Sequence, residues 1–297
     1  MGGKRGSNRV SSPKNTCVVP GRSDRTRRYV VFTDMDGTLL DHETYSVRGA
    51  VSALDLLMRR KVDVVPVTSK TAAEVLRWMR LLILDGPYIS ENGCGISIPE
   101  GFFRDNPDGA ELIHGEWKIH LGVEIGQVRA VLEKIAGEVG FQYRSFGQME
   151  ASEISALTGL TWEEAQLSRQ RDYDEAFFIP MEHEPEKIRE AAQKHGFTLL
   201  RGGRCYHLTG GCHKGKAVKI LSELYRRHKG MVLTIGIGDS ANDLPMLEAV
   251  DRPFVVQKPD GSYDPDIPAG AAHRVDGIGP KGWRMAIEEI MAGDGKH

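Results

Sequence analysis

The apolar residues of the first ninety positions follow two alternating spacings. Three short runs rich in β-branched and aromatic residues, at 29–33, 62–67 and 87–90, predict buried strands. The segments between them repeat apolar residues every three or four positions, which predicts helices over 47–61 and 71–84. Strands that alternate with helices in this way predict right-handed βαβ units and a largely parallel sheet.

This alternation breaks near residue 95 and returns after residue 210. Beyond 210 the pattern predicts a helix from about residue 214, a strand at 231–237 and another helix after residue 239. The segment between mixes turns, short strands and helices, including a predicted helix over 123–139. We therefore expect an α/β fold in which one domain is inserted into another. The predicted parts are a Rossmann-like catalytic core of residues 29–95 and 210–297, and an inserted α+β cap of residues 96–209.

Charge is unevenly distributed although the net charge of the 297 residues is only -2. Residues 1–28 carry eight lysines and arginines against one aspartate. We interpret this segment as a solvated, disordered leader because it has few large apolar residues to bury. A basic tail that touches nucleic acid or an anionic surface is the alternative. The leader lacks the apolar stretch of a secretory signal, whereas a transit peptide stays open.

Four cysteines are scattered without a Cys-x-x-Cys pair: Cys17, Cys94, Cys205 and Cys212. This spacing predicts reduced, structural thiols in a cytoplasmic protein and indicates no zinc site. No apolar run reaches the length of a membrane span, so no membrane association is expected.

The sharpest candidate for chemistry is Asp34-Met35-Asp36-Gly37, directly after the first predicted strand. Open α/β sheets bind ligands beyond the carboxyl ends of their strands, where these two aspartates fall. Like charges held this close favour protonation of one carboxyl group unless a cation neutralises them. With Mg²⁺ present, Asp34 could act as a nucleophile and Asp36 as a general acid and base. Taken alone, the segment is equally compatible with an acidic surface turn.

A second acidic cluster, Gly236 to Asp243, follows the predicted strand 231–237. Asp239 and Asp243 are four residues apart and therefore approach the same face of a turn and the helix after it. With Asn242 they supply the oxygen ligands that Mg²⁺ prefers. Two acidic clusters at strand ends in one α/β chain are less expected by chance than either alone.

Two further segments are compatible with anion binding but are individually weak. Thr68-Ser69-Lys70 lies at a predicted strand end and helix start, where a hydroxyl and free amides favour an anion. Lys214 opens a helix beside Gly215, where its charge could balance crowded carboxylates and a phosphoryl group. An ordinary helix cap and a solvated lysine explain these segments as well.

Taken in order, the four segments resemble the motifs of the haloacid dehalogenase-like phosphatases, with Asp-x-Asp-Gly-Thr, Thr/Ser, Lys and Gly-Asp-x-x-Asn-Asp. The resemblance implies the roles of these residues. Asp34 would be the nucleophile and Asp36 the general acid and base, Thr68 would bind phosphate with Ser69 and Lys70, and Lys214 would stabilise the phosphoryl group. The implied ligands of Mg²⁺ are Asp239, Asn242, Asp243, Asp34 and the Asp36 carbonyl. Mn²⁺ or Co²⁺ could substitute for Mg²⁺.

Stretches in and just before the inserted segment resemble the mannosyl-3-phosphoglycerate phosphatase family, among them Ser90-Glu91-Asn92-Gly93 and Gly202-Gly203-Arg204-x-Tyr206-His207. One departure is Ala176 before Phe177, where that family has proline. The implied substrate, a phosphorylated glycosyl-glycerate, carries a phosphate and a carboxylate, which guanidinium groups bind well. We therefore name Arg204, Arg171 and His207 as candidates for binding it. Arg204 is the first of these candidates, and the alternative for each is an exposed charge or a packed residue of the cap.

Other activities stay open. The sugar could be mannose or glucose, sucrose 6-phosphate is an alternative substrate, and a phosphomutase would share the first half-reaction. A protein that binds nucleic acid through its leader is a third class, but every catalytic position is filled. We expect a cytoplasmic monomer or homodimer that binds no nucleic acid.

Overall fold

The computed structural model describes residues 1–2, 28–180, 184–202 and 205–293, so most of the predicted leader lies outside the described residues. A five-stranded parallel sheet forms the centre, in the order β13-β12-β11-β1-β2. Its strands are β1 (Arg28–Thr33), β2 (Asp63–Pro66), β11 (Val232–Gly238), β12 (Arg252–Gln257) and β13 (His273–Ile278). The parallel sheet expected from the βαβ pattern is therefore present.

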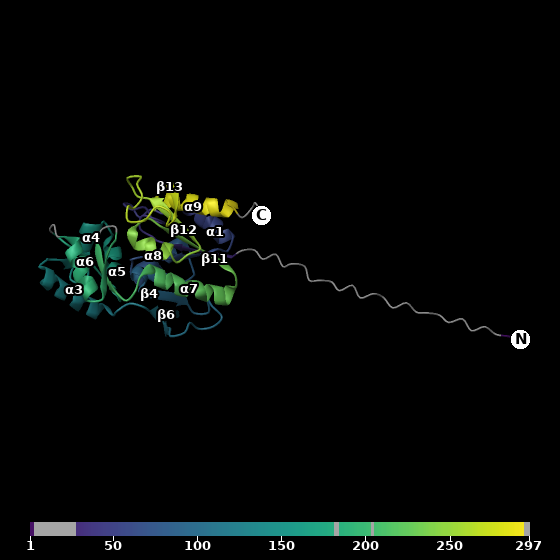
Figure 1. Cartoon of the computed structure of the whole chain (residues 1–297), viewed down its shortest axis with the longest axis horizontal. Coiled ribbons are helices and arrows are strands. Elements are labelled where there is room, and N and C mark those ends of the chain that lie inside the picture. The colour runs from purple at the N-terminus through teal and green to yellow at the C-terminus, as the bar shows by residue number, and fades with distance from the viewer. Residues whose placement is uncertain (3–27, 181–183, 203–204, 294–297) are drawn as a thin grey trace.

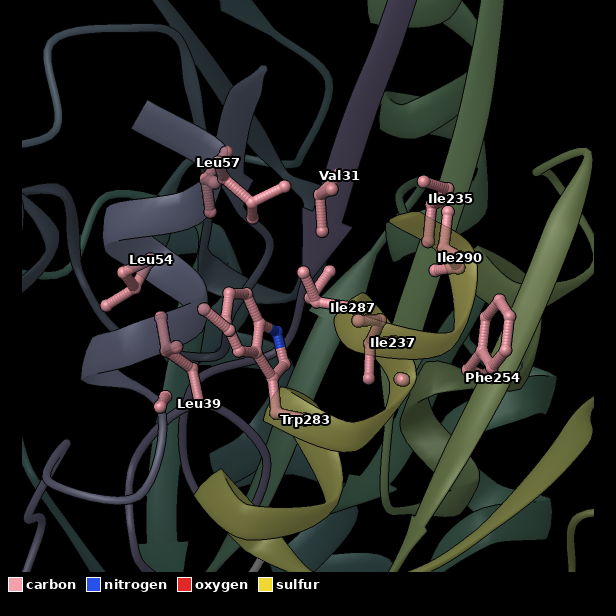
Figure 2. Packing of buried hydrophobic residues seen from close by; sticks show 14 of the residues in the cluster. Val31, Leu39, Leu54, Leu57, Ile235, Ile237, Phe254, Trp283, Ile287 and Ile290 are labelled. Atoms are coloured by element: carbon pink, nitrogen blue, oxygen red, sulfur yellow. The ribbon is translucent and has the colours of Figure 1, made fainter. Parts of the chain in front are cut away.

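Both faces of this sheet are covered, because successive side chains of a strand point to opposite sides. Val31 faces one layer, made of α1 (Val51–Arg59) and α9 (Gly279–Gly293), and Figure 2 shows Trp283 of α9 packed there beside Leu54 and Leu57 of α1. Phe32 faces the other layer, which contains α7 (Lys214–Lys229) and α8 (Leu244–Leu247). Burial on both faces explains why β1 reads as an unbroken apolar run.

Two helices differ from their predicted bounds. Helix α1 begins at Val51 rather than at Val47, because Ser46 accepts a hydrogen bond from the amide of Arg48 in a turn. The helix expected after Asp239 is only the four-residue α8, preceded by a 3-10 turn at Ala241–Asp243. Helix α2 (Ala72–Leu82) has the predicted capping box of Thr71 and Glu74.

A four-stranded antiparallel sheet, in the order β3-β4-β6-β5, packs beside α7. Its strands are β3 (Tyr88–Ser90), β4 (Gly95–Pro99), β5 (Glu111–Ile113) and β6 (Glu116–His120). Ile96 and Ile98 of β4 are buried in the same cluster as Phe32 of β1. Residues 96–120, assigned from the sequence to the inserted segment, thus pack with the central sheet, and the domain boundaries stay a prediction.

A second antiparallel sheet, in the order β7-β8-β10-β9, carries the remaining inserted elements. Helices α3 (Ile125–Val139) and α6 (Pro185–Lys194) cover one of its faces, and α4 (Ala151–Thr158) and α5 (Trp162–Ser168) the other. These four helices gather at one end of the molecule in Figure 1, away from α7 and α9. The strands are β7 (Arg144–Ser145), β8 (Asp174–Phe178), β9 (Phe197–Arg201) and β10 (Tyr206–Gly210). This unit, called the cap below, completes the predicted α/β core with an inserted α+β domain.

The expectation of reduced thiols is wrong for two cysteines. Cys94, just before β4, and Cys212, just before α7, form a disulfide with their Cα atoms 5.0 Å apart. The two residues are 118 positions apart, so their spacing could not reveal the pairing. Cys205 is free, and Cys17 lies outside the described residues. No helix within the described ranges combines the length and apolar character of a membrane span.

Candidate functional site

The candidate residues of the core gather where three neighbouring strands end. Asp34 follows β1, Asp239 follows β11, and Thr68 comes two residues after β2. Because β1 lies between β11 and β2 and all three are parallel, their carboxyl ends meet at one edge of the sheet. The sheet order therefore brings together residues that are about two hundred positions apart.

Close packing of the backbone fixes the first turn. Gly37 has a φ of +81°, and a Cβ atom there would lie 2.9 Å from Oδ2 of Asp239. Glycine is thus needed both for the backbone conformation and for the approach of the two acidic turns. The Thr38 hydroxyl donates a hydrogen bond of 3.2 Å to Oδ1 of Asp239.

Three carboxylates form the centre of the site. Asp34, Asp239 and Asp243 are buried, and each offers an oxygen within 4.8 Å of the others. Burial raises the pKa of Asp34 well above its usual value, and the neighbouring charge of Asp243 raises it further. Burial followed by the charge of Asp243 likewise raises the pKa of Asp239. A cation among these oxygens would offset both the burial of the charges and their mutual repulsion.

Lys214 supplies one positive charge to this cluster. Its Nζ donates hydrogen bonds of 2.7 Å to Oδ1 of Asp34 and 2.6 Å to Oδ1 of Asp243. Burial disfavours the ammonium charge, but Asp243 and Asp34 outweigh it and raise the pKa of Lys214. This lysine is the first residue of α7 and is only 1% exposed, so it is not the solvated lysine considered as an alternative.

Asp36 lies at the edge of the acidic centre and is paired with another cation. Its Oδ2 is 2.8 Å from Nζ of Lys70, while its Oδ1 is buried and has no hydrogen-bond partner among the described residues. Burial opposes the charge of Lys70, but Asp36 and then Glu74 raise its pKa. Asp36 therefore lies between a fixed positive charge and the space that a ligand would occupy.

The remaining motif residues hold turns as well as lining the site. The Thr68 hydroxyl accepts a hydrogen bond from the amide of Lys70 at 3.2 Å. Oδ2 of Asp243 accepts hydrogen bonds from the amides of Asp239 and Ser240 at 3.0 and 3.1 Å. Nδ2 of Asn242 donates to Oδ1 of Asn92 at 3.4 Å. Asp243 thus orients the turn that carries Asp239.

A pocket next to Asp36 extends into the cap. Lys70 and Ser69 line it from the core, and Arg171 and His207 line it from the cap. Both cap cations are buried, and they share Asp174 as a partner: Arg171 Nη1 lies 2.6 Å and His207 Nδ1 2.8 Å from its Oδ1. Arg204, the third cap candidate, lies outside the described residues.

Residues that the sequence analysis did not single out for chemistry also belong to the site. Asp174 is fully buried between the two cap cations, and Asn92 donates a hydrogen bond of 2.7 Å to its Oδ2. Lys258 places Nζ 3.7 Å from Oδ2 of Asp239. The only signal in the sequence was the resemblance of the segment around Asn92 to one family, and that resemblance implied no role for Asn92 or Asp174.

Comparison with known proteins identifies the family. The model of the haloacid dehalogenase-like hydrolases matches residues 31–106 and 161–260, more than half of the chain. The chain belongs to this hydrolase family. A member from Methanococcoides burtonii, named glucosyl-3-phosphoglycerate/mannosyl-3-phosphoglycerate phosphatase, is 43% identical over 89% of this chain and 97% of its own length.

Other relatives of the hydrolase family agree with this assignment. Mannosyl-3-phosphoglycerate phosphatase of Pyrococcus horikoshii is 34% identical over 76% of this chain and 90% of its own length. A phosphatase of the same superfamily from Bacteroides thetaiotaomicron superposes with a TM-score of 0.62 at 19% identity, covering 92% of this chain and 99% of its own. That solved structure supports the fold alone.

Proposed function

We propose that this hydrolase removes phosphate from a glycosyl-3-phosphoglycerate, with mannosyl-3-phosphoglycerate as the preferred substrate, through an aspartyl-phosphate on Asp34. The observation that carries the proposal is the contact of 2.7 Å between Asp34 and Lys214 inside a buried group of three carboxylates. The two relatives described above are named for this class of substrate. Mannosylglycerate and inorganic phosphate would be the products.

In the first step, an oxygen of Asp34 attacks phosphorus and the bond from phosphorus to the glycerate oxygen breaks. Asp36 donates its proton to the departing oxygen, since it is partly exposed, lines the same pocket as Asp34 and lies two residues after it. Lys214 balances negative charge on the phosphoryl group, and Thr68 and Lys70 hold phosphoryl oxygens. Water then attacks phosphorus, Asp36 takes the water's proton, and Asp34 is released with phosphate.

The donor atoms of the centre fit a divalent metal ion that prefers oxygen ligands. Asp34, Asp239 and Asp243 are buried carboxylates with too few positive charges around them, and Asp36 Oδ1 has no partner among the described residues. We propose that these carboxylates hold Mg²⁺ together with the Asp36 carbonyl and Asn242, with Mn²⁺ or Co²⁺ as substitutes. The ion would supply positive charge that orients the phosphate and keeps Asp34 ionised.

The cap pocket suits the carboxylate of the glycerate part. Burial opposes a charge on His207, but Asp174 outweighs it and raises the pKa of His207 to about 10. His207 and Arg171 are therefore both positive at neutral pH, and they share Asp174 as their partner. Lys70 adds a third cation to the lining of the pocket, and Asp36 and Glu74 add carboxylates. We propose His207 and Arg171, with Arg204, as the carboxylate-binding group.

A panel of phosphate esters tests the function. Phosphate release is expected to be fastest with mannosyl-3-phosphoglycerate, followed by glucosyl-3-phosphoglycerate, and slow with sucrose 6-phosphate and hexose phosphates that lack a carboxylate. The Asp34→Asn variant, which lacks the proposed nucleophile, is the negative control for phosphate release. Equal rates on esters with and without a carboxylate would contradict the substrate class, and transfer of phosphate to sugar without net release would favour a phosphomutase.

A cytoplasmic monomer or homodimer that needs no nucleic acid remains our proposal for the organisation of this enzyme. Gel filtration of the full chain with light scattering measures its oligomeric state directly.

A further inference from the structure

A series of side-chain hydrogen bonds, buried except at Asn242, runs from the acidic centre of the core to the cap pocket. Asn242 donates to Oδ1 of Asn92 at 3.4 Å, and Asn92 donates to Oδ2 of Asp174 at 2.7 Å. Asp174 in turn holds Arg171 and His207. Asn92 and Asp174 are 1% and 0% exposed, so water does not compete for the bond between them.

At the core end of these hydrogen bonds, two neighbouring residues have an uncommon backbone conformation. Glu91 and Asn92 both have left-handed conformations, with φ values of +46° and +57°. Such residues cost about 1 to 2 kcal/mol each and persist where the surroundings over-determine them. Here the carboxylate of Glu91 accepts hydrogen bonds of 3.1, 2.8 and 3.0 Å from the amides of Asp172, Tyr173 and Asp174. The strained turn is therefore fastened to the two residues before β8 and to the first residue of that strand.

Asp174 is in a position to orient the side chains of Arg171 and His207. Its carboxylate faces Arg171 and His207 through Oδ1, while Oδ2 receives Asn92 from the core. The Nε of Arg171 is buried and has no hydrogen-bond partner among the described residues, and both cations line the pocket. A carboxylate ligand in that pocket would contact two cations whose positions are fixed by their shared contact with Asp174.

We propose that Asp174 and Asn92 are positioning residues: Asp174 holds Arg171 and His207 toward the ligand, and Asn92 fixes Asp174 relative to the metal-binding turn of the core. This inference rests on the proposed carboxylate-binding role of the pocket. Neither residue touches the reacting atoms. Their effect should therefore fall on ligands that carry a carboxylate and spare ligands that carry only phosphate.

The test measures inhibition of p-nitrophenyl phosphate hydrolysis by two probes, 3-phosphoglycerate and inorganic phosphate. In Asp174→Asn the inhibition constant of 3-phosphoglycerate is expected to rise roughly ten-fold or more, which is the loss of one charge-assisted hydrogen bond. The constant for inorganic phosphate should stay within about two-fold of the wild-type value. Asn92→Ala should give a similar, smaller selective change, and it keeps the test decisive if Asp174→Asn does not fold.

Two controls separate positioning from general destabilisation. Asp172→Asn removes a carboxylate two residues away that is exposed. Arg77→Gln breaks a different contact between core and cap, the 2.8 Å pair of Arg77 with Glu164. Both variants should keep the ratio of the two inhibition constants at the wild-type value.

The outcomes are distinct. A selective change in Asp174→Asn and Asn92→Ala, with a double variant whose effect is smaller than the product of the two, supports the inference. Equal losses for both probes, or the same selectivity change in Arg77→Gln, would overturn it. Failure of the wild-type enzyme to hydrolyse glycosyl-3-phosphoglycerates would overturn the proposed function alone, because the inhibition assay does not depend on that turnover.

Discussion

Replacement of Gly93 by alanine should damage catalysis although Gly93 carries no functional group. Gly93 has a φ of +93°, and a Cβ atom there would lie 2.4 Å from the carbonyl carbon and oxygen of His213 and 2.5 Å from the nitrogen of Lys214. These are backbone atoms at the start of α7, so they cannot rotate away. Reaching an ordinary contact of about 3.5 Å requires the two segments to separate by roughly 1 Å.

That displacement acts directly on Lys214, whose Nζ is held at 2.7 Å from Asp34 and 2.6 Å from Asp243. A shift of about 1 Å in a catalytic group costs on the order of 10²-fold in rate. Stability should fall as well, by about 1 to 2 kcal/mol for the left-handed alanine and about 1 to 3 kcal/mol for overpacking. In a domain of this size this lowers Tm by roughly 4 to 20 °C.

Gly115→Ala is the matched control for Gly93→Ala. Gly115 has a φ of +81°, and a Cβ atom there would meet nothing within 4 Å. The control therefore has the conformational cost without the clash. Steady-state phosphate release at saturating substrate, combined with thermal unfolding followed by circular dichroism, measures both effects. A folded Gly93→Ala enzyme with kcat within about three-fold of Gly115→Ala would refute the reasoning.

Four further predictions concern the nucleophile, the metal ion, His207 and the disulfide. Asp34→Asn should abolish phosphate release without lowering Tm, since it removes the nucleophile and also one of three repelling charges; measurable turnover would contradict the assignment. Exhaustive treatment with EDTA should stop activity and added Mg²⁺ should restore it, so full activity without metal would disprove the metal site. His207, whose pKa rises from 6.5 to about 10, stabilises the fold fully below pH 6.5 and loses this contribution as pH rises through 10. Tm should therefore fall between pH 7 and 10, and less in His207→Gln; parallel curves for the two proteins would argue against it. Thiol titration in denaturant should find two fewer thiols before reduction than after it, because Cys94 and Cys212 are joined, and equal counts would exclude the disulfide.

Local sequence determined most elements of the core. The run 29–33 is apolar except at Thr33 because both faces of the sheet are covered, and turn-forming residues follow it. The capping box at Thr71 and Glu74 marked the start of α2 because its hydrogen bonds join residues only three positions apart. The shift in the start of α1 shows the limit of this approach, because helical spacing of apolar residues continues through the turn before it.

The types of the proposed catalytic residues could also be predicted from the sequence, since acidic and hydroxyl residues at strand ends indicate a ligand site. The side chains that they contact could not be predicted. Only the order of the strands places Asp239 beside Asp34, and only the packing of α7 places Lys214 between Asp34 and Asp243. The disulfide likewise depends on the folded chain, which brings Cys94 and Cys212 together although they are 118 positions apart.

The sequence by itself thus determined the α/β class, the order of the elements and the acidic turns, because periodicity and turn chemistry act over a few residues. The tertiary structure decided which buried charges neutralise each other. It alone places Asp174 between Arg171 and His207 and links it through Asn92 to the core. The physical reason is that a buried charge is tolerated only beside a partner, and that partner is chosen by the fold rather than by its distance along the chain.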